Sequence, residues 1–211
     1  MSSAREEILR RIAAAGAPPE QQPVARAYRQ IGALAANERV ELFCRRVGEY
    51  RADVQRIAAA DVTTAISSAC SERTARTLVV PPGLPEVWRP ADVELIDDHG
   101  LSALDLDRVD GAVTGCTVGI AETGTIVLTG GAAEGRRALS LVPDLHICLV
   151  REAQIVELLP EALAAIAADR LEQHPITFIS GPSATSDIEL SRVEGVHGPR
   201  SLVVLVVKEP S

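Results

Sequence analysis

The feature that most constrains this chain is the alternation of short aliphatic runs with helical segments from residue 61 onwards. The runs consist mostly of Val, Leu and Ile without a polar face, which is typical of parallel strands covered by helices on both sides. They are TLVV (77–80), DVELI (92–96), DGAVTG (110–115), GTIVLTG (124–130), LHICLVR (145–151), ITFIS (176–180) and SLVVLVV (201–207). Helical patterns at 63–76 and 160–173 interrupt them. The sequence therefore predicts an α/β fold with an open, mainly parallel sheet, in which ligands bind beyond the carboxyl ends of the strands.

The N-terminal part has a different pattern, and we expect a helical N-terminal region at 1–60 followed by an α/β core domain at 61–211. Ser3 and Glu6 have the spacing of a capping box at the start of a first helix. The proline-containing stretch GAPPEQQP (16–23) then predicts a linker.

A second helix is predicted from Asn37 to Ala60. Its apolar residues recur at steps of three and four and form one stripe. They are Val40, Phe43, Val47, Tyr50, Val54 and Ile57. Two interpretations are open: the stripe packs on the chain's own domain, or it is the seam of a homodimer, for example in a ligand-sensing module.

Composition excludes several classes of protein. The formal net charge of -8 and the aromatic content of 2% argue against a nucleic-acid-binding protein, which needs basic grooves and stacking platforms. The four cysteines are far apart and form no C-x-x-C motif, so we expect no metal or iron–sulfur cofactor in this chain. The charged N-terminus lacks the apolar region of a signal peptide, and no run is long enough to span a membrane. These features predict a cytoplasmic protein.

The densest group of small residues is the glycine- and threonine-rich segment 111–137, which is suited either to a ligand site or to close packing of strands. In its AETG turn, Glu122 is a candidate catalytic carboxylate. The neighbouring ligand-binding candidates are Thr123, Gly124 and Thr125. Gly130 and Gly135 have the spacing of a phosphate-binding loop, but two arginines follow where Lys and Ser/Thr are required, which argues against nucleotide binding.

The connection between the last two aliphatic runs, 179–200, is long and polar, which is typical of functional or mobile loops. Its SGPS turn does not match the G-x-S-x-G elbow of serine hydrolases, so we interpret its polar side chains as ligand-binding candidates rather than a catalytic triad. They are Ser180, Gly181, Ser183, Asp187, Glu189, His197 and Arg200. Because the SGPS and AETG turns each adjoin a run of the same predicted sheet, we expect these groups to converge with Glu122 at one end of that sheet.

Four of these segments together resemble the LUD-domain family, of the lactate-utilisation protein C type. They are AETGTIVL (121–128), RRALSLVPDLHICLV (136–150), ISGPSATSDIE (179–189) and GVHGPR (195–200). The resemblance spans about residues 109–207 in the order of the family, and the N-terminal half matches in general layout. It implies a fold similar to the sugar-phosphate isomerase and CoA-transferase group, with an open α/β sheet.

The resemblance also implies a function. It identifies the chain as an accessory component of a system that oxidises L-lactate to pyruvate, with the iron–sulfur clusters in partner subunits and a small anionic ligand as a further expectation. The alternative is a stand-alone enzyme of the acyl- or CoA-transferase class. Related CoA-transferases have an acidic nucleophile in a Glu-x-Gly turn, which Glu122-Thr123-Gly124 resembles. However, PPGLPEVW (81–88) follows the first run instead of a Gly-Ser/Thr phosphate loop, so whether the chain is an enzyme stays open.

Overall fold

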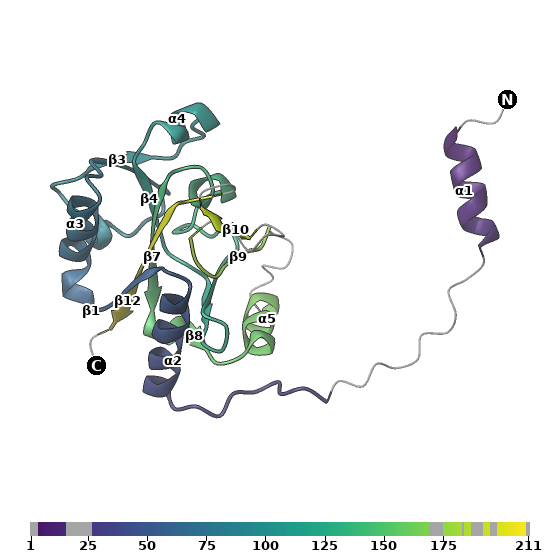
Figure 1. Cartoon of the computed structure of the whole chain (residues 1–211), viewed down its shortest axis with the longest axis horizontal. Coiled ribbons are helices and arrows are strands. Elements are labelled where there is room, and N and C mark those ends of the chain that lie inside the picture. The colour runs from purple at the N-terminus through teal and green to yellow at the C-terminus, as the bar shows by residue number, and fades with distance from the viewer. Residues whose placement is uncertain are drawn as a thin grey trace.

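A six-stranded parallel sheet lies at the centre of the structure, a computed structural model that describes residues 4–15, 27–168, 175–182, 184–186, 192–194 and 198–209 (Figure 1). Its strands are β1 (Asp53–Ala58), β2 (Thr77–Val80), β3 (Glu94–Asp97), β4 (Gly111–Thr114), β7 (Leu145–Arg151) and β12 (Ser201–Lys208). Their order is β1-β12-β7-β4-β2-β3, and every adjacent pair is parallel. The predicted open, mainly parallel α/β fold is confirmed.

A second, smaller sheet contains two of the aliphatic runs that the sequence placed in the main sheet, so that part of the prediction is wrong. Its strands are β5 (Val118–Ile120), β6 (Thr125–Leu128), β8 (Ile155–Val156) and β9 (Thr177–Ile179), in the order β8-β5-β6-β9. Strand β6 is antiparallel to both β5 and β9. The physical reason is chain length: adjacent parallel strands need a crossover of about a dozen residues or more, whereas a tight turn joins β5 to β6 as a hairpin. A further antiparallel pair is formed by β10 (Ala184–Ser186) and β11 (Arg192–Glu194).

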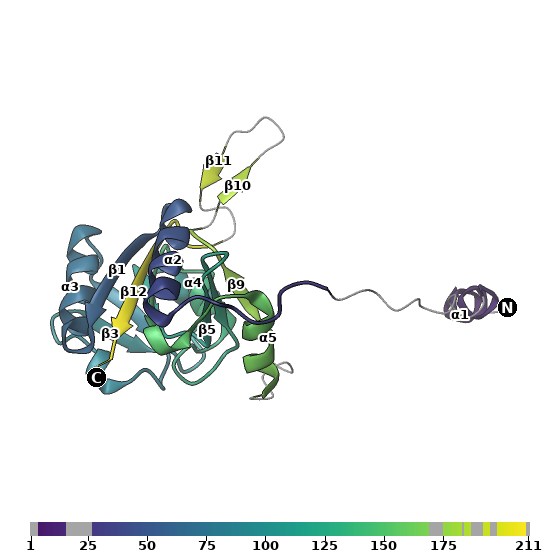
Figure 2. The same ribbon diagram turned by 90° about the horizontal axis from the view of Figure 1, so that it is seen from below.

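The helices and the two sheets pack against one another in layers, as Figure 2 shows. They are α1 (Ala4–Ala14), α2 (Ala36–Glu49), α3 (Val62–Glu72), α4 (Ala103–Asp107) and α5 (Leu159–Ala168). Helix α3 covers one face of the main sheet, while α2 and the smaller sheet cover the other. Helix α5 packs on the outer side of the smaller sheet, and α1 has no buried residue. No helix within the described ranges is long and apolar enough to cross a membrane.

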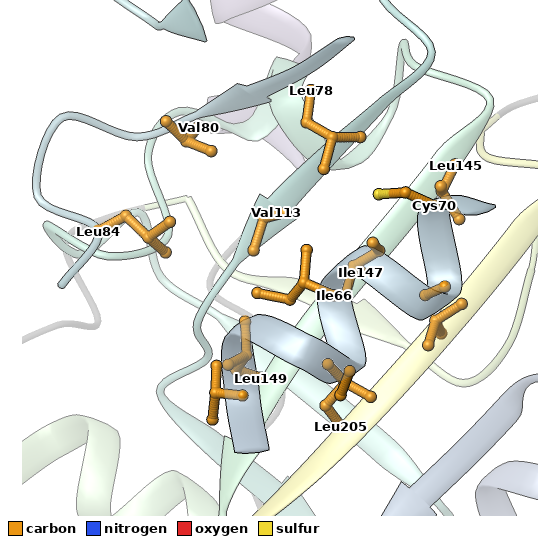
Figure 3. Close-up of a cluster of buried hydrophobic side chains, with 14 of the residues drawn as sticks. Ile66, Cys70, Leu78, Val80, Leu84, Val113, Leu145, Ile147, Leu149 and Leu205 are labelled. Atoms are coloured by element: carbon orange, nitrogen blue, oxygen red, sulfur yellow. The ribbon is translucent and has the colours of Figure 1, made fainter. Parts of the chain in front are cut away.

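The strands of the main sheet divide their side chains between these two layers. On β7, Ile147 and Leu149 contribute to the cluster under α3, and Cys148 and Val150 contribute to the cluster under α2. This follows from the alternation of side chains along a strand. Figure 3 shows the first cluster, in which Ile66 of α3 lies among apolar side chains of the sheet. Both faces are buried, which explains why the strand sequences are apolar throughout.

Helix α2 is shorter than the sequence predicts. It ends at Glu49, and Val54 and Ile57 belong to strand β1 at one edge of the main sheet, so the expectation of a helix continuing to Ala60 is wrong. Arg51, with a φ of 66°, lies in the left-handed region and helps to separate the helix from the strand. Edge strands and amphipathic helices both show a partial apolar pattern, so periodicity over a short segment did not distinguish them.

The apolar stripe of α2 packs inside the chain. Val40, Phe43 and Val47 are buried against the face of the main sheet opposite α3, together with residues of the smaller sheet. The interpretation that the stripe packs on its own domain is therefore confirmed for these residues.

The environment of the cysteines predicts low thiol reactivity. Burial raises the pKa of Cys70 to about 11, and a hydrogen bond with the Cys148 thiol, together with burial, raises the pKa of Cys116. Because the thiolate is the reactive form, we expect both thiols to resist iodoacetamide in the native protein and to react readily after denaturation. Mass spectrometry of alkylated peptides measures this. Equal labelling of the native and denatured protein at both positions would contradict the expectation.

Candidate functional site

The AETG and SGPS turns lie side by side. Because β6 and β9 are antiparallel, the start of β6 is adjacent to the end of β9. The hydroxyl groups of Thr125 and Ser180 are 2.8 Å apart, and those of Thr123 and Thr125 are also 2.8 Å apart. The pairing that joins the two turns belongs to the smaller sheet, so our expectation that both turns adjoin strands of one parallel sheet is wrong. A chain of three hydroxyl groups connects the two turns.

Two glycines in these turns are packed tightly against the end of α2. Gly124 has a φ of 62°, and a Cβ at this position would lie 2.6 Å from the backbone nitrogen of Val47. Gly181 has a φ of 151°, and a Cβ there would lie 2.7 Å from the Cβ of Tyr50. Both glycines therefore have a packing role. Ligand binding by the hydroxyl groups beside them stays a prediction.

Glu122 is held in an ion pair that the sequence did not predict. Its carboxylate accepts a hydrogen bond of 2.6 Å from the Nη2 of Arg29, whose Nη1 donates to Glu157 at 3.1 Å. The side chains of Glu122 and Arg29 are 49% and 63% exposed, so solvent and a partner molecule can reach them. A nucleophilic role for Glu122 would require this ion pair to open, and that role stays a prediction.

The carboxylate of Glu157 anchors the segment that carries Arg29. One of its oxygens accepts hydrogen bonds from the backbone N–H groups of Ala33 and Leu34, at 2.6 and 2.7 Å. The hydrogen bond from Leu34 is the largest cause of its lowered pKa, and that from Ala33 and the guanidinium of Arg29 also contribute. Sequence reasoning missed Arg29 and Glu157, because a contact between residues more than a hundred positions apart leaves no local motif.

Beside Glu122 lies an open groove with a volume of about 730 Å³. It is lined by Tyr28 and Arg29 on one side and by the first residues of α5 on the other. Three of its apolar side chains, Tyr28, Leu159 and Leu163, are exposed by 55%, 42% and 47%. Clustered exposed apolar groups beside an ion pair are typical of a binding surface rather than of a core. We call this surface the Tyr28–Leu163 groove.

The other predicted site residues are not brought to Glu122 by any described contact. Arg200 directly precedes β12, and its guanidinium is 3.6 Å from the carboxylate of Asp144. It lines a separate cavity of about 400 Å³, beside Arg73 and Asp110. The remaining candidates lie outside the described residues: they are Ser183, Asp187, Glu189 and His197.

The architecture defines a class: an open, parallel α/β sheet with a small mixed sheet on one face and a hydroxyl-lined hairpin turn beside an ion-paired glutamate. A LUD domain matches residues 103–207. Over 209 residues, 98% of this chain and 96% of the relative, the sequence is 46% identical to lactate utilization protein C of Deinococcus radiodurans. The chain belongs to the LUD-domain family.

Two further comparisons agree with this assignment. Lactate utilization protein C of Halalkalibacterium halodurans is 33% identical over 129 residues, which are 59% of this chain and 53% of that relative. The crystal structure of a DUF162 family protein from Deinococcus radiodurans aligns with a TM-score of 0.73 and 41% identity, and the alignment covers 83% of this chain and 99% of that chain.

Proposed function

We propose that the chain is an accessory component of a system that oxidises L-lactate to pyruvate. The observation that carries this proposal is the 46% identity to a lactate utilization protein C over nearly the whole of both chains. In this proposal the iron–sulfur clusters are in partner subunits, and this chain binds those subunits. Growth of a deletion strain on L-lactate tests the role. Unchanged growth in a strain without a second copy of the gene would refute it.

We assign partner binding to the Tyr28–Leu163 groove. Its exposed apolar side chains supply buried area, and the ion pair between Arg29 and Glu122 supplies polar contacts at its rim. Leu159 and Leu163 are four residues apart on α5 and therefore project from one face of the helix. An apolar centre with a polar rim is the usual composition of a protein–protein interface.

A charged substitution in the groove tests the assignment. We expect Leu163→Glu to weaken the complex with the iron–sulfur subunits by about tenfold or more, because it places an unpaired charge in the centre of the interface. The free energy of unfolding should change by less than about 0.5 kcal/mol, since Leu163 is exposed. Co-expression with the iron–sulfur subunits, followed by size-exclusion chromatography and the visible absorbance of the clusters, measures complex formation.

The matched control is Leu104→Glu. Leu104 lies on α4, outside the groove, and is 71% exposed, so the substitution adds the same charge at another surface. Loss of the complex in Leu163→Glu but not in Leu104→Glu supports the groove. If the two variants form the complex to the same extent, the assignment of partner binding to the groove is refuted. The proposed role in lactate oxidation would then still be tested by the growth experiment.

A further inference from the structure

A third cavity lies next to the loop 130–136, at the carboxyl edge of the main sheet. The loop 130–136 follows β6 and covers the ends of three parallel strands. The backbone N–H of Gly115, which follows β4, donates to the carbonyl of Ala133 at 2.7 Å. Arg136 pairs with Asp98, which follows β3, at 2.6 Å. Strand β2 lies between β3 and β4. The connection from β2 leads to β3 on one side, and the connection from β3 leads back to β4 on the other side of β2. This is the position at which open α/β sheets bind ligands.

The cavity next to this loop has a volume of about 420 Å³, within the range of small-molecule sites. Arg137 and Thr177 both line it. Among the described residues, the guanidinium of Arg137 and the hydroxyl of Thr177 have no hydrogen-bond or ion-pair partner. Leu128, Ala132 and Pro175 supply apolar parts of the wall. As far as the described residues show, the cavity therefore offers a guanidinium and a hydroxyl without partners beside an apolar surface.

Charges around the cavity decide which anion fits. Glu134 is 5% exposed, and one of its oxygens accepts hydrogen bonds from the backbone N–H groups of Thr129, Gly130 and Gly131, at 2.6, 2.9 and 3.1 Å. Its other oxygen accepts from the hydroxyl of Thr117 at 2.6 Å. The glycine amides that could bind a phosphate are thus already engaged by a carboxylate. The negative charge of Glu134 also disfavours a dianion more strongly than a monoanion.

We propose that this cavity binds a small monocarboxylate, with its carboxylate on the guanidinium of Arg137 and a hydroxyl or carbonyl oxygen at Thr177. A planar guanidinium matches a carboxylate in a bidentate geometry. The positive charge of Arg136 is neutralised by Asp98, whereas the next residue, Arg137, has no partner within the described part of the chain. The inference rests on the proposed function only for the choice of L-lactate and pyruvate as probes.

Thermal unfolding of the full chain with added ligands tests the site. We expect the sodium salt of L-lactate or pyruvate, at about 100 times its Kd, to raise the Tm by about 5–10 °C relative to sodium chloride at equal ionic strength. Arg137→Gln should abolish the shift, and Thr177→Val should reduce it. Arg137 loses no side-chain contact to any described residue, so the Tm of the unliganded variant should stay close to that of the wild type.

Arg108→Gln is the matched control, since Arg108 is an arginine of another cavity with a 78% exposed side chain. It removes the same charge and should leave the shift unchanged. Three results would overturn the site: no shift with either carboxylate, a shift that survives Arg137→Gln, or a shift with phosphate or ribose 5-phosphate alone. Formation of the complex with the iron–sulfur subunits is measured independently of the Tm shift. If the complex forms but no carboxylate raises the Tm, only the monocarboxylate site is refuted. If a carboxylate raises the Tm but no complex forms, only the proposal of partner binding is refuted.

Discussion

Replacing Gly124 with alanine should destabilise the protein by about 2–4 kcal/mol, a large part of the stability of an ordinary domain. Two costs add. The φ of 62° is in the left-handed region, which costs a residue with a Cβ about 1 kcal/mol or more. The new Cβ would also lie 2.6 Å from backbone atoms of Arg46 and Val47. Those atoms belong to a helix and cannot rotate away, so overpacking adds about 1–3 kcal/mol.

Urea denaturation followed by circular dichroism measures this change. Gly100→Ala is the matched control, because Gly100 also has a positive φ, of 98°, but a Cβ there would meet nothing within 4 Å. The control isolates the cost of the backbone conformation, which should be about 1 kcal/mol. If the two variants lost equal stability, the close contact between the AETG turn and α2 would be wrong.

The stability of the wild-type protein should fall by about 2 kcal/mol between pH 7 and pH 5 because of one buried histidine. Burial lowers the pKa of His146 to about 4, against about 6.5 in the unfolded chain. Between these values the unfolded state binds a proton that the folded state excludes, so stability is lost as the pH falls. The loss from this group should reach about 3 kcal/mol at pH 4 and change little below it.

The structure explains why His146 excludes the proton. It lies on β7 and is 1% exposed, with its Nε2 placed 2.8 Å from the hydroxyl of Thr114. Its Nδ1 is buried without a hydrogen-bond partner among the described residues, so a charged ring would have one N–H unpaired. His146→Gln removes the titrating group and keeps a polar partner for Thr114. The difference in unfolding free energy between wild type and variant, measured from pH 7 to pH 4, should follow this curve; a constant difference would contradict the pKa shift.

Local pattern predicted most of the main sheet correctly. The aliphatic runs that form β2, β3, β4, β7 and β12 belong to one sheet and are parallel, as predicted. Long, apolar, β-branched segments carry a strong signal, because both faces of a covered parallel sheet must be apolar. The same signal did not assign each run to a sheet. Strands β6 and β9 are as apolar as the others, and only the short connection between β5 and β6 forces an antiparallel hairpin.

The candidate site was predicted less completely than the fold. The sequence identified the AETG and SGPS turns, and the structure brings their hydroxyl groups to 2.8 Å. It gave no indication that Arg29 pairs with Glu122, since nothing near either residue specifies the other. In the sequence, Arg136 and Arg137 stand where a phosphate-binding loop requires Lys and Ser/Thr, so they served only as an argument against nucleotide binding. Arg136 is neutralised by Asp98, and Arg137 lines the cavity without a partner in the described ranges; this difference depends on contacts between distant segments.

The class of fold and the family could be predicted from the amino-acid sequence, because hydrophobic patterning and local motifs are properties of neighbouring residues. By contrast, the packing of the AETG and SGPS glycines against α2 and the extension of the sheet by residues 53–58 became visible only in the folded chain. The same holds for Arg137, which has no partner among the residues that the structure describes. Each of these depends on contacts between distant segments, whose geometry follows from packing the whole chain around two sheets.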